Sequence, residues 1–308
     1  MKIVFMGNPG FSIPTMKAIL ESQHDIIGVV SNPPKPMGRG RKLKSTAVGE
    51  FAKDNNLNLI EPTSLKSPDL HQSLTKLSPD IFVIVAYRIL PKSLINLPKF
   101  GAVNLHASLL PKYRGAGPIQ WSLINGDQVS GVTIFQLKPK VDTGDILMQK
   151  EIPINKNDDM MSLGMKLCIS GADLLVETLD KLEKGTITPL KQNHEKATPA
   201  PKITKAMTQI NWTSPARKIH NWIRGLSPRP GMATMFKGKN FRIYKSTTID
   251  YPSEIPGQII KVNSGELVVA TGDGALSLLE VQAEGKRKMC IEDFLRGATI
   301  NIGDTLGI

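Results

Sequence analysis

Cysteines, metal-ligand clusters and long apolar runs are scarce in this sequence. The two cysteines among 308 residues, Cys168 and Cys290, lie far apart in the chain, so we interpret them as reduced thiols and not as a disulfide framework. No group of cysteines and histidines has the spacing of metal ligands, and we expect no metal. No apolar run approaches the ~18 residues that a transmembrane helix needs, so we expect no membrane partner. Residues 1–7 are typical of a strand and a turn, which leaves no room for a signal or transit peptide, and we expect a cytoplasmic protein.

Acidic residues are fewer than basic ones. The chain has 39 lysines and arginines against 27 aspartates and glutamates, a formal net charge of +12. A surplus of this size favours polyanionic partners, because basic side chains that contact phosphates release the counterions bound there. Bulk charge also varies among organisms, so this number alone leaves a nucleic-acid partner and a merely basic surface both open.

Length and residue pattern predict two domains, of which the first is α/β. Residues 2–6 and 26–30 are short apolar runs, and between them we expect a helix that Ser12 caps and Pro14 begins. This order predicts a βαβ unit of a parallel sheet. Residues 80–86 are almost continuously apolar, as expected of a central parallel strand buried on both faces. We therefore expect a Rossmann-like, mostly parallel sheet.

The pattern changes towards the C-terminus. Residues 159–183 have the periodicity of one long amphipathic helix, and the Pro-, Thr- and Lys-rich stretch that follows is expected to be an extended linker. Beyond it, about five short strands with tight turns predict a small barrel of the OB type, an architecture often used to bind nucleic acid. The strands are expected at 233–236, 241–245, 257–261, 267–271 and 275–281. The expected division is an α/β domain at 1–184, a linker at 185–206 and an OB-like β-barrel domain at 207–308.

Polar side chains interrupt the apolar strand expected from residue 102. Asn104 and His106 are two positions apart, and successive side chains of a strand point to opposite faces, so both should project from one face at the strand's carboxyl end. An amide and an imidazole there provide an oxyanion donor beside a general base. A loop dense in glycine and proline follows, and a later Asp-Thr-Gly turn offers the carboxylate of Asp142, which could fold back over the same place. These groups are what an amine needs to attack a carbonyl-like carbon, and they predict an acyl or one-carbon transfer site.

Each of these residues also has a purely structural interpretation. A histidine near a strand end is often structural, an asparagine often caps a turn, and an aspartate before Thr-Gly often only builds one. The combination of a polar pair, an irregular loop and a later carboxylate favours the chemical interpretation.

Two segments resemble the formyltetrahydrofolate-dependent formyltransferases, most closely those that act on methionyl-tRNA. They are NLHASLLPKYRGAGPIQWSLINGD (104–127) and GVTIFQLKPKVDTGDIL (131–147), and the resemblance extends over nearly the whole chain. It implies 10-formyltetrahydrofolate as the co-substrate and initiator methionyl-tRNA as the acceptor. It implies catalytic roles for Asn104, His106 and Asp142. It also associates the folate with the segment Ser108, Leu109, Leu110 and Pro111.

A basic stretch, SNPPKPMGRGRKLKS at 31–45, contains five cations and no acidic residue. One interpretation is a solvated loop. The other is a flexible arm that orders only when it lies on phosphates and bases, and the resemblance favours this one, because formyltransferases that act on tRNA insert a basic loop into the acceptor arm. The residues expected to bind tRNA are Lys35, Arg39, Arg41, Lys42 and Lys44.

Three positions depart from the usual pattern of that family. Asn8 and Gly10 stand in a turn that is usually Gly-Thr-Pro-acid-Phe, and Arg88 stands where a glycine normally shapes the pterin pocket between residues 86 and 91. Two other functions stay open: a formyltransferase acting on an amino-sugar nucleotide or another small amine, and a non-catalytic RNA-binding protein. We expect a monomer.

Overall fold

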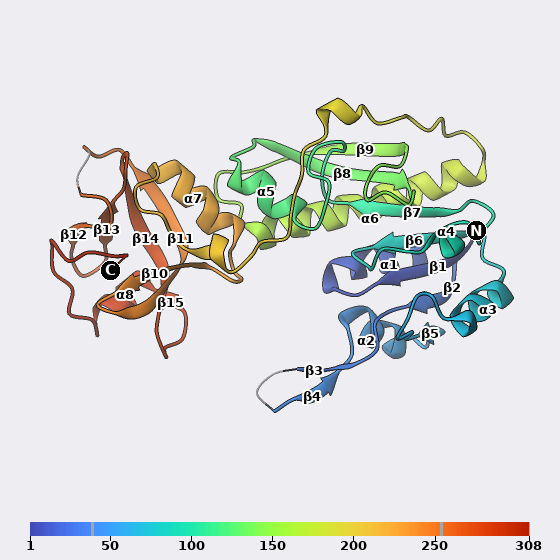
Figure 1. Ribbon diagram of the computed structural model, residues 1–308, viewed down its shortest axis with the longest axis horizontal. Coiled ribbons are helices and arrows are strands. Elements are labelled where there is room, and N and C mark those ends of the chain that lie inside the picture. Colours follow the sequence, from blue (N-terminus) through green and yellow to red (C-terminus); the bar gives the residue numbers. More distant parts are fainter. Residues whose placement is uncertain (38–39, 253–254, 308) are drawn as a thin grey trace. The chain divides into compact units, whose positions relative to one another are not determined.

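The computed structural model describes residues 1–37, 40–252 and 255–307, and the chain divides into two compact units (Figure 1). Unit 1 comprises Met1–Pro118, Val129–Pro153 and Gly164–Ala200. Unit 2 comprises Ile119–Gln128, Ile154–Leu163 and Pro201–Ile308. The chain therefore enters unit 2 twice before it finally leaves unit 1.

Unit 1 is built on one large sheet, which among the described residues has seven strands in the order β5-β2-β1-β6-β7-β8-β9. The first five strands of this order are parallel, and β8 and β9 are added antiparallel. This confirms the predicted Rossmann-like, mostly parallel sheet. The strands are β1 (Lys2–Gly7), β2 (Asp25–Val30), β5 (Leu59–Ile60), β6 (Ile81–Val85), β7 (Ala102–His106), β8 (Val129–Gln136) and β9 (Ile146–Pro153).

Helices cover both faces of this sheet. On one face, α3 and α4 pack against Val4, Phe82 and Ile84 in a common apolar cluster. On the other face lies α6, whose Gly171 is so near β7 that a Cβ there would be 2.8 Å from Leu105. The helices that belong wholly or partly to unit 1 are α1 (Ile13–Leu20), α2 (Ala47–Asp54), α3 (Pro68–Leu77), α4 (Lys92–Ile95), α5 (Pro118–Ile124) and α6 (Met160–Glu183).

We predicted that Ser12 caps the first helix, and this prediction is wrong. Its hydroxyl makes no capping hydrogen bond and instead donates to the carbonyl oxygen of Val85 at 2.8 Å. A capping hydroxyl accepts a hydrogen bond from a helix amide, and the Ser12 oxygen accepts none from this helix. Thr46 does cap α2, since its Oγ1 accepts from the amide of Gly49 at 2.9 Å.

The basic stretch contains a short hairpin where we predicted a flexible loop. Strands β3 (Lys35–Met37) and β4 (Lys42–Lys44) pair antiparallel, with Lys35 opposite Lys44, and form a separate two-stranded sheet. Backbone pairing alone defines it, because β4 is exposed along its whole length. In Figure 1 the hairpin extends away from the large sheet of unit 1.

Unit 2 contains an antiparallel sheet in the order β10-β11-β14-β13-β12, with β15 paired to β14. The C-terminal residues join its two edges, because Leu306 bridges to Phe236 of β10 while Thr305 bridges to Gln258 beside β12. The C-terminal residues thus link the two edges of this antiparallel sheet, and the OB type of barrel expected here stays a prediction. The strands are β10 (Met232–Phe236), β11 (Lys239–Ile249), β12 (Ile259–Val262), β13 (Leu267–Ala270), β14 (Ala275–Ala283) and β15 (Met289–Cys290).

Two helices pack against the sheet of unit 2. Ile219 and Ile223 of α7 (Ala216–Gly225) join Phe241 and Leu278 of the sheet in one buried cluster, and α8 (Ile291–Leu295) contributes Ile291. In the described parts of the chain, no helix combines the length and apolarity that a bilayer crossing requires.

Candidate active site

The site begins at the carboxyl end of β7. Asn104 pairs with Ile84 of β6 and with Phe135 of β8. His106 lies two positions further on, and alternation along the strand places both side chains on the same face. The His106 ring is buried, with 7% of the residue exposed, and packs edge-on against the ring of Phe135 with centroids 6.4 Å apart.

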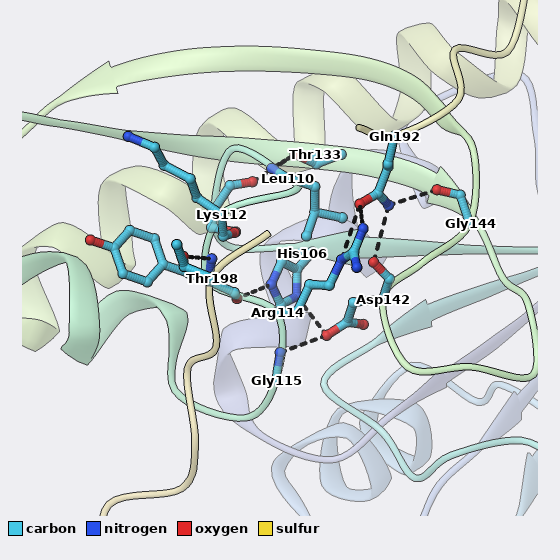
Figure 2. A network of polar contacts seen from close by, with 12 residues as sticks. His106, Leu110, Lys112, Arg114, Gly115, Thr133, Asp142, Gly144, Gln192 and Thr198 are labelled. Atoms are coloured by element: carbon cyan, nitrogen blue, oxygen red, sulfur yellow. Dashed lines mark hydrogen bonds and ion pairs between the residues drawn. The ribbon is translucent and has the colours of Figure 1, made fainter. Parts of the chain in front are cut away.

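Both nitrogens of the His106 ring face a polar group. Nε2 lies 2.8 Å from the backbone carbonyl oxygen of Tyr113, and Nδ1 lies 3.9 Å from Oδ2 of Asp142. A carbonyl oxygen can only accept, so Nε2 carries the hydrogen. In the neutral ring Nδ1 therefore has the free lone pair, on the side of the carboxylate. Figure 2 shows the His106 ring beside Asp142.

Asp142 reaches this place through a tight turn between β8 and β9. Its backbone has a φ of 50°, in the left-handed region where aspartate is one of the few tolerated side chains. Gly144 makes the turn possible, since a Cβ there would lie 1.5 Å from the carbonyl oxygen of Gln136. The amide of Gly115 donates to Asp142 Oδ2 at 2.8 Å. The structure thus brings Asp142 to His106, and the amide of Gly115 holds the carboxylate there.

The four residues predicted to contact folate form the loop directly after β7. Ser108 Oγ donates to the carbonyl oxygen of Lys112 at 2.7 Å, and Leu110 is 3% exposed. Thr133 Oγ1 donates to the Ser108 carbonyl at 2.6 Å and accepts from the Leu110 amide at 3.1 Å. Gln149 Nε2 donates to the Leu110 carbonyl at 2.9 Å. These bonds fix the conformation of the loop against β8 and β9. In this conformation the carbonyl oxygen of Tyr113 faces Nε2 of His106.

Sequence reasoning missed three residues of this network, Arg114, Gln192 and Thr198. Arg114 donates to Gln192, and the Tyr113 amide donates to Thr198 Oγ1 at 2.9 Å. Burial lowers the pKa of the Arg114 guanidinium, and the charge of Asp142 opposes that shift. Arg114 lies inside the segment 104–127 and could have been singled out there. Gln192 and Thr198 lie in the predicted linker, where nothing in the composition indicated a site.

Arg88, which departs from the family pattern, lies against the loop after β5. Its Nη2 donates to the carbonyl oxygen of Pro62 at 3.0 Å and to the hydroxyl of Tyr87 at 2.8 Å. Nη1 donates to the carbonyl oxygen of Thr63 at 3.3 Å. Burial raises the pKa of the Tyr87 phenol, against the effect of Arg88. Arg88 thus connects the loop after β6 to the loop after β5.

The basic hairpin carries its cations at the surface. Lys35, Arg41, Lys42 and Lys44 are all exposed, and Arg41 has a left-handed backbone with φ 45° at the turn. Arg39, the fifth residue predicted to contact tRNA, lies outside the described residues.

Models of two protein families match the chain. Residues 1–179 match the formyl transferase family, and residues 202–299 match the formyl transferase C-terminal domain. The methionyl-tRNA formyltransferase of Caldanaerobacter subterraneus subsp. tengcongensis is 44% identical over 309 residues, which cover 99% of this chain and 100% of that protein. The methionyl-tRNA formyltransferase of Acetivibrio thermocellus is 40% identical over 310 residues and 100% of both chains.

Among solved structures, the N-formyltransferase from Helicobacter canadensis in complex with folinic acid and dTDP-3-aminofucose has the same fold. The TM-score is 0.68 at 21% identity, over 94% of this chain and 100% of that one. Family models that match both parts of the chain, together with relatives 40–44% identical over essentially its whole length, show that this chain belongs to the methionyl-tRNA formyltransferase family.

Proposed function

We propose that this protein transfers the formyl group of 10-formyltetrahydrofolate to the α-amino group of initiator methionyl-tRNA for translation initiation. The family supports the reaction. The observation that carries it in this chain is the meeting of an imidazole and a carboxylate from distant segments, with His106 Nδ1 and Asp142 Oδ2 3.9 Å apart. The residues to which we assign catalysis are Asn104, His106 and Asp142.

The nucleophile needs little activation. An α-amine titrates near ~7.7–8.0, so a usable fraction is unprotonated at neutral pH. The protein's main tasks are therefore to hold the amine against the formyl carbon and to stabilise the charge that develops there.

In the mechanism we propose, the amine nitrogen attacks the formyl carbon, and the new N–C bond forms as the carbonyl oxygen becomes an oxyanion. The side-chain amide of Asn104 donates to that oxygen. His106 accepts the amine proton at Nδ1, because Nε2–H is already donated to the Tyr113 carbonyl. A nearby carboxylate favours the protonated ring, and Asp142 provides it. The same proton then passes to N10 of the folate as the N10–C bond breaks, so protons and charge balance.

The co-substrate and the RNA are assigned to different parts of the chain. We assign 10-formyltetrahydrofolate to the loop Ser108–Pro111, which leads directly from the catalytic strand. We assign the acceptor stem of the tRNA to the basic hairpin, whose exposed cations suit phosphates; they are Lys35, Arg41, Lys42 and Lys44, together with Arg39. We further propose that residues 1–184 contain the chemistry and that residues 207–308 contact the tRNA, with 185–206 joining them.

A second candidate keeps the chemistry and changes the acceptor to an amino-sugar nucleotide. It is favoured by the fold shared with the Helicobacter canadensis enzyme, whereas the basic hairpin and the net charge of +12 favour RNA. Two parallel incubations separate the two candidates. With 10-formyltetrahydrofolate and charged initiator tRNA we expect formyl-methionine after hydrolysis of the ester, and with dTDP-amino sugars we expect no formylated product. The reverse result, or no transfer to either acceptor, would exclude our proposal.

We also propose that the protein acts as a monomer in the cytoplasm, where charged initiator tRNA is used. Sedimentation at working concentration should give a mass near 33.7 kDa, and about twice that mass would contradict the monomer.

A further inference from the structure

The segment 190–200, which the sequence predicted to be part of a linker, lies against the candidate active site. At one end, Leu190 and Ile146 exchange two backbone hydrogen bonds of 2.8 Å, and Ile146 begins the strand just after the Asp142 turn. At the other end, Arg114 donates its amide to Thr198 at 2.9 Å and accepts from the amide of Ala200 at 2.7 Å. The segment is therefore paired with both loops that enclose His106.

Gln192 is the buried centre of this segment, with 7% of the residue exposed. Its Nε2 donates to the carbonyl oxygens of Asp142 and Gly144 at 3.0 and 2.7 Å. Its Oε1 accepts from Nε and Nη2 of Arg114 at 3.2 and 2.5 Å. An amide offers two hydrogens and two lone pairs, and all four are in use. Figure 2 shows Gln192 reaching from its own segment to the Asp142 turn and to Arg114.

These bonds constrain the position of the Asp142 carboxylate in two ways. Gln192 holds the backbone of Asp142, whose side chain faces His106. It also holds Arg114, the neighbour of Gly115, and the amide of Gly115 is the donor that fixes Asp142 Oδ2. The side chain of Gln192 is linked to His106 only through these intermediates.

We propose that Gln192 is a positioning residue for formyl transfer, which sets the place of the Asp142 carboxylate relative to His106. This rests on the proposed function, because it assumes that Asp142 assists the reaction. An apolar residue at position 192 takes the donor away from the carbonyl groups of Asp142 and Gly144, so the turn is free to move. Arg114 also loses its acceptor Gln192 and keeps the contact of its Nη2 with His194 Nδ1 at 2.9 Å. A shift of about 1 Å at a catalytic group can cost ~100-fold in rate.

The test is a double-mutant cycle measured in single turnover, with 10-formyltetrahydrofolate and methionyl-tRNA at saturation. Gln192→Met should lower the rate ~10–100-fold, with the KM of both substrates little changed. In an Asp142→Ala background the same substitution should cost almost nothing, because Gln192 acts through that carboxylate. A wild-type rate in Gln192→Met, or a loss equally large in both backgrounds, would overturn the proposal.

Asn193→Ala is the matched control. Asn193 lies next to Gln192 and accepts from the amide of Glu195 at 3.0 Å, so its loss loosens the segment without touching the Asp142 turn. It should keep the wild-type rate, and a loss as large as that of Gln192→Met would show that no specific role belongs to the glutamine.

A second variant covers the case in which Gln192→Met does not fold. Gln192→Glu keeps the shape and still accepts from Arg114, but it places an oxygen opposite the carbonyls of Asp142 and Gly144. It should fold and lose rate similarly, and a folded Gln192→Glu protein with the wild-type rate contradicts the proposal. The wild-type protein separates a failure of the proposed function from a failure of this inference. If the wild-type protein makes no formyl-methionine, the proposed function fails. If it makes formyl-methionine and the Gln192 variants are equally fast, only the role of Gln192 fails.

Discussion

The Nε2 atom of His106 lies 2.8 Å from the backbone carbonyl oxygen of Tyr113. This contact decides which tautomer the neutral ring adopts, and with it which nitrogen is available for proton transfer. Tyr113 offers its carbonyl because the loop turns sharply there, with a φ of 62°. The loop after β7, whose first part we assign to folate, therefore also determines which nitrogen of the histidine accepts the proton.

We predict that neutral His106 is the Nε2–H tautomer, because Nε2 faces the carbonyl oxygen of Tyr113. Nitrogen NMR of 15N-histidine-labelled protein distinguishes the two ring nitrogens by shift. The spectrum of His106→Gln identifies the His106 signals by their disappearance. Finding the hydrogen on Nδ1 in the neutral ring would contradict the direction of proton transfer proposed here.

Asp142→Asn should slow turnover ~100-fold while the protein stays folded. The amide oxygen still accepts from Gly115, so the turn keeps its shape, but the charge that favours protonated His106 is gone. Removing one preorganised electrostatic group of this kind typically costs 10²–10³-fold. Thermal unfolding of both proteins provides the check on folding, and turnover within threefold of wild type would show that the carboxylate is only structural.

Neutralising three hairpin cations, Arg41, Lys42 and Lys44, to glutamine should raise KM for tRNA and leave KM for the folate unchanged. If each cation contacts one phosphate, the slope of log KM against log salt should fall by about 2–3. The control is a variant that loses the same charge at exposed lysines elsewhere in unit 1, Lys76, Lys92 and Lys99. Equal effects of the two triple variants would mean that only net charge matters.

His220 in α7 should make the stability of unit 2 depend on pH. Burial lowers the pKa of His220, as does the charge of Arg224, whereas a hydrogen bond with Ser246 raises it. The unfolded chain thus binds a proton near pH 6.5 that the folded unit resists. The stability contributed by neutral His220 is complete above about pH 6.5 and is lost as pH falls through the lower, folded pKa.

Unfolding of wild type and His220→Gln should be compared between pH 7.5 and 5. The difference in unfolding free energy should shrink with acidity by at most ~1.4 kcal/mol per pH unit, the limit for one proton. Parallel curves would show that His220 titrates alike in both states.

Local signals predicted the elements that lie in the core. The apolar run of β6 predicted a strand that is buried at every position, and the periodicity at 159–183 predicted α6. The hairpin β3–β4 was missed because no residue pattern separates a buried from an exposed face there. Its strands are defined by backbone pairing, which leaves little trace in composition.

The sequence indicated the candidate side chains of the site, but it did not indicate which contacts they make with one another. The sequence shows the amide, the imidazole and the carboxylate, but no spacing rule fixes the approach of Asp142 to His106. Gln192 has no local signal because its partners come from two distant turns. The role of Ser12 was mispredicted for a similar reason. Its hydroxyl donates to Val85, which is far away in the sequence, on β6.

His106 is the residue on which the proposed reaction depends most directly. Formylation of charged initiator tRNA should be measured in single turnover for wild type and His106→Ala, with 10-formyltetrahydrofolate binding measured in parallel. We predict that folate binding is retained and that the rate falls by ~10²–10⁴-fold, the usual contribution of a positioned acid–base group. Near-normal formylation by His106→Ala would contradict the mechanism.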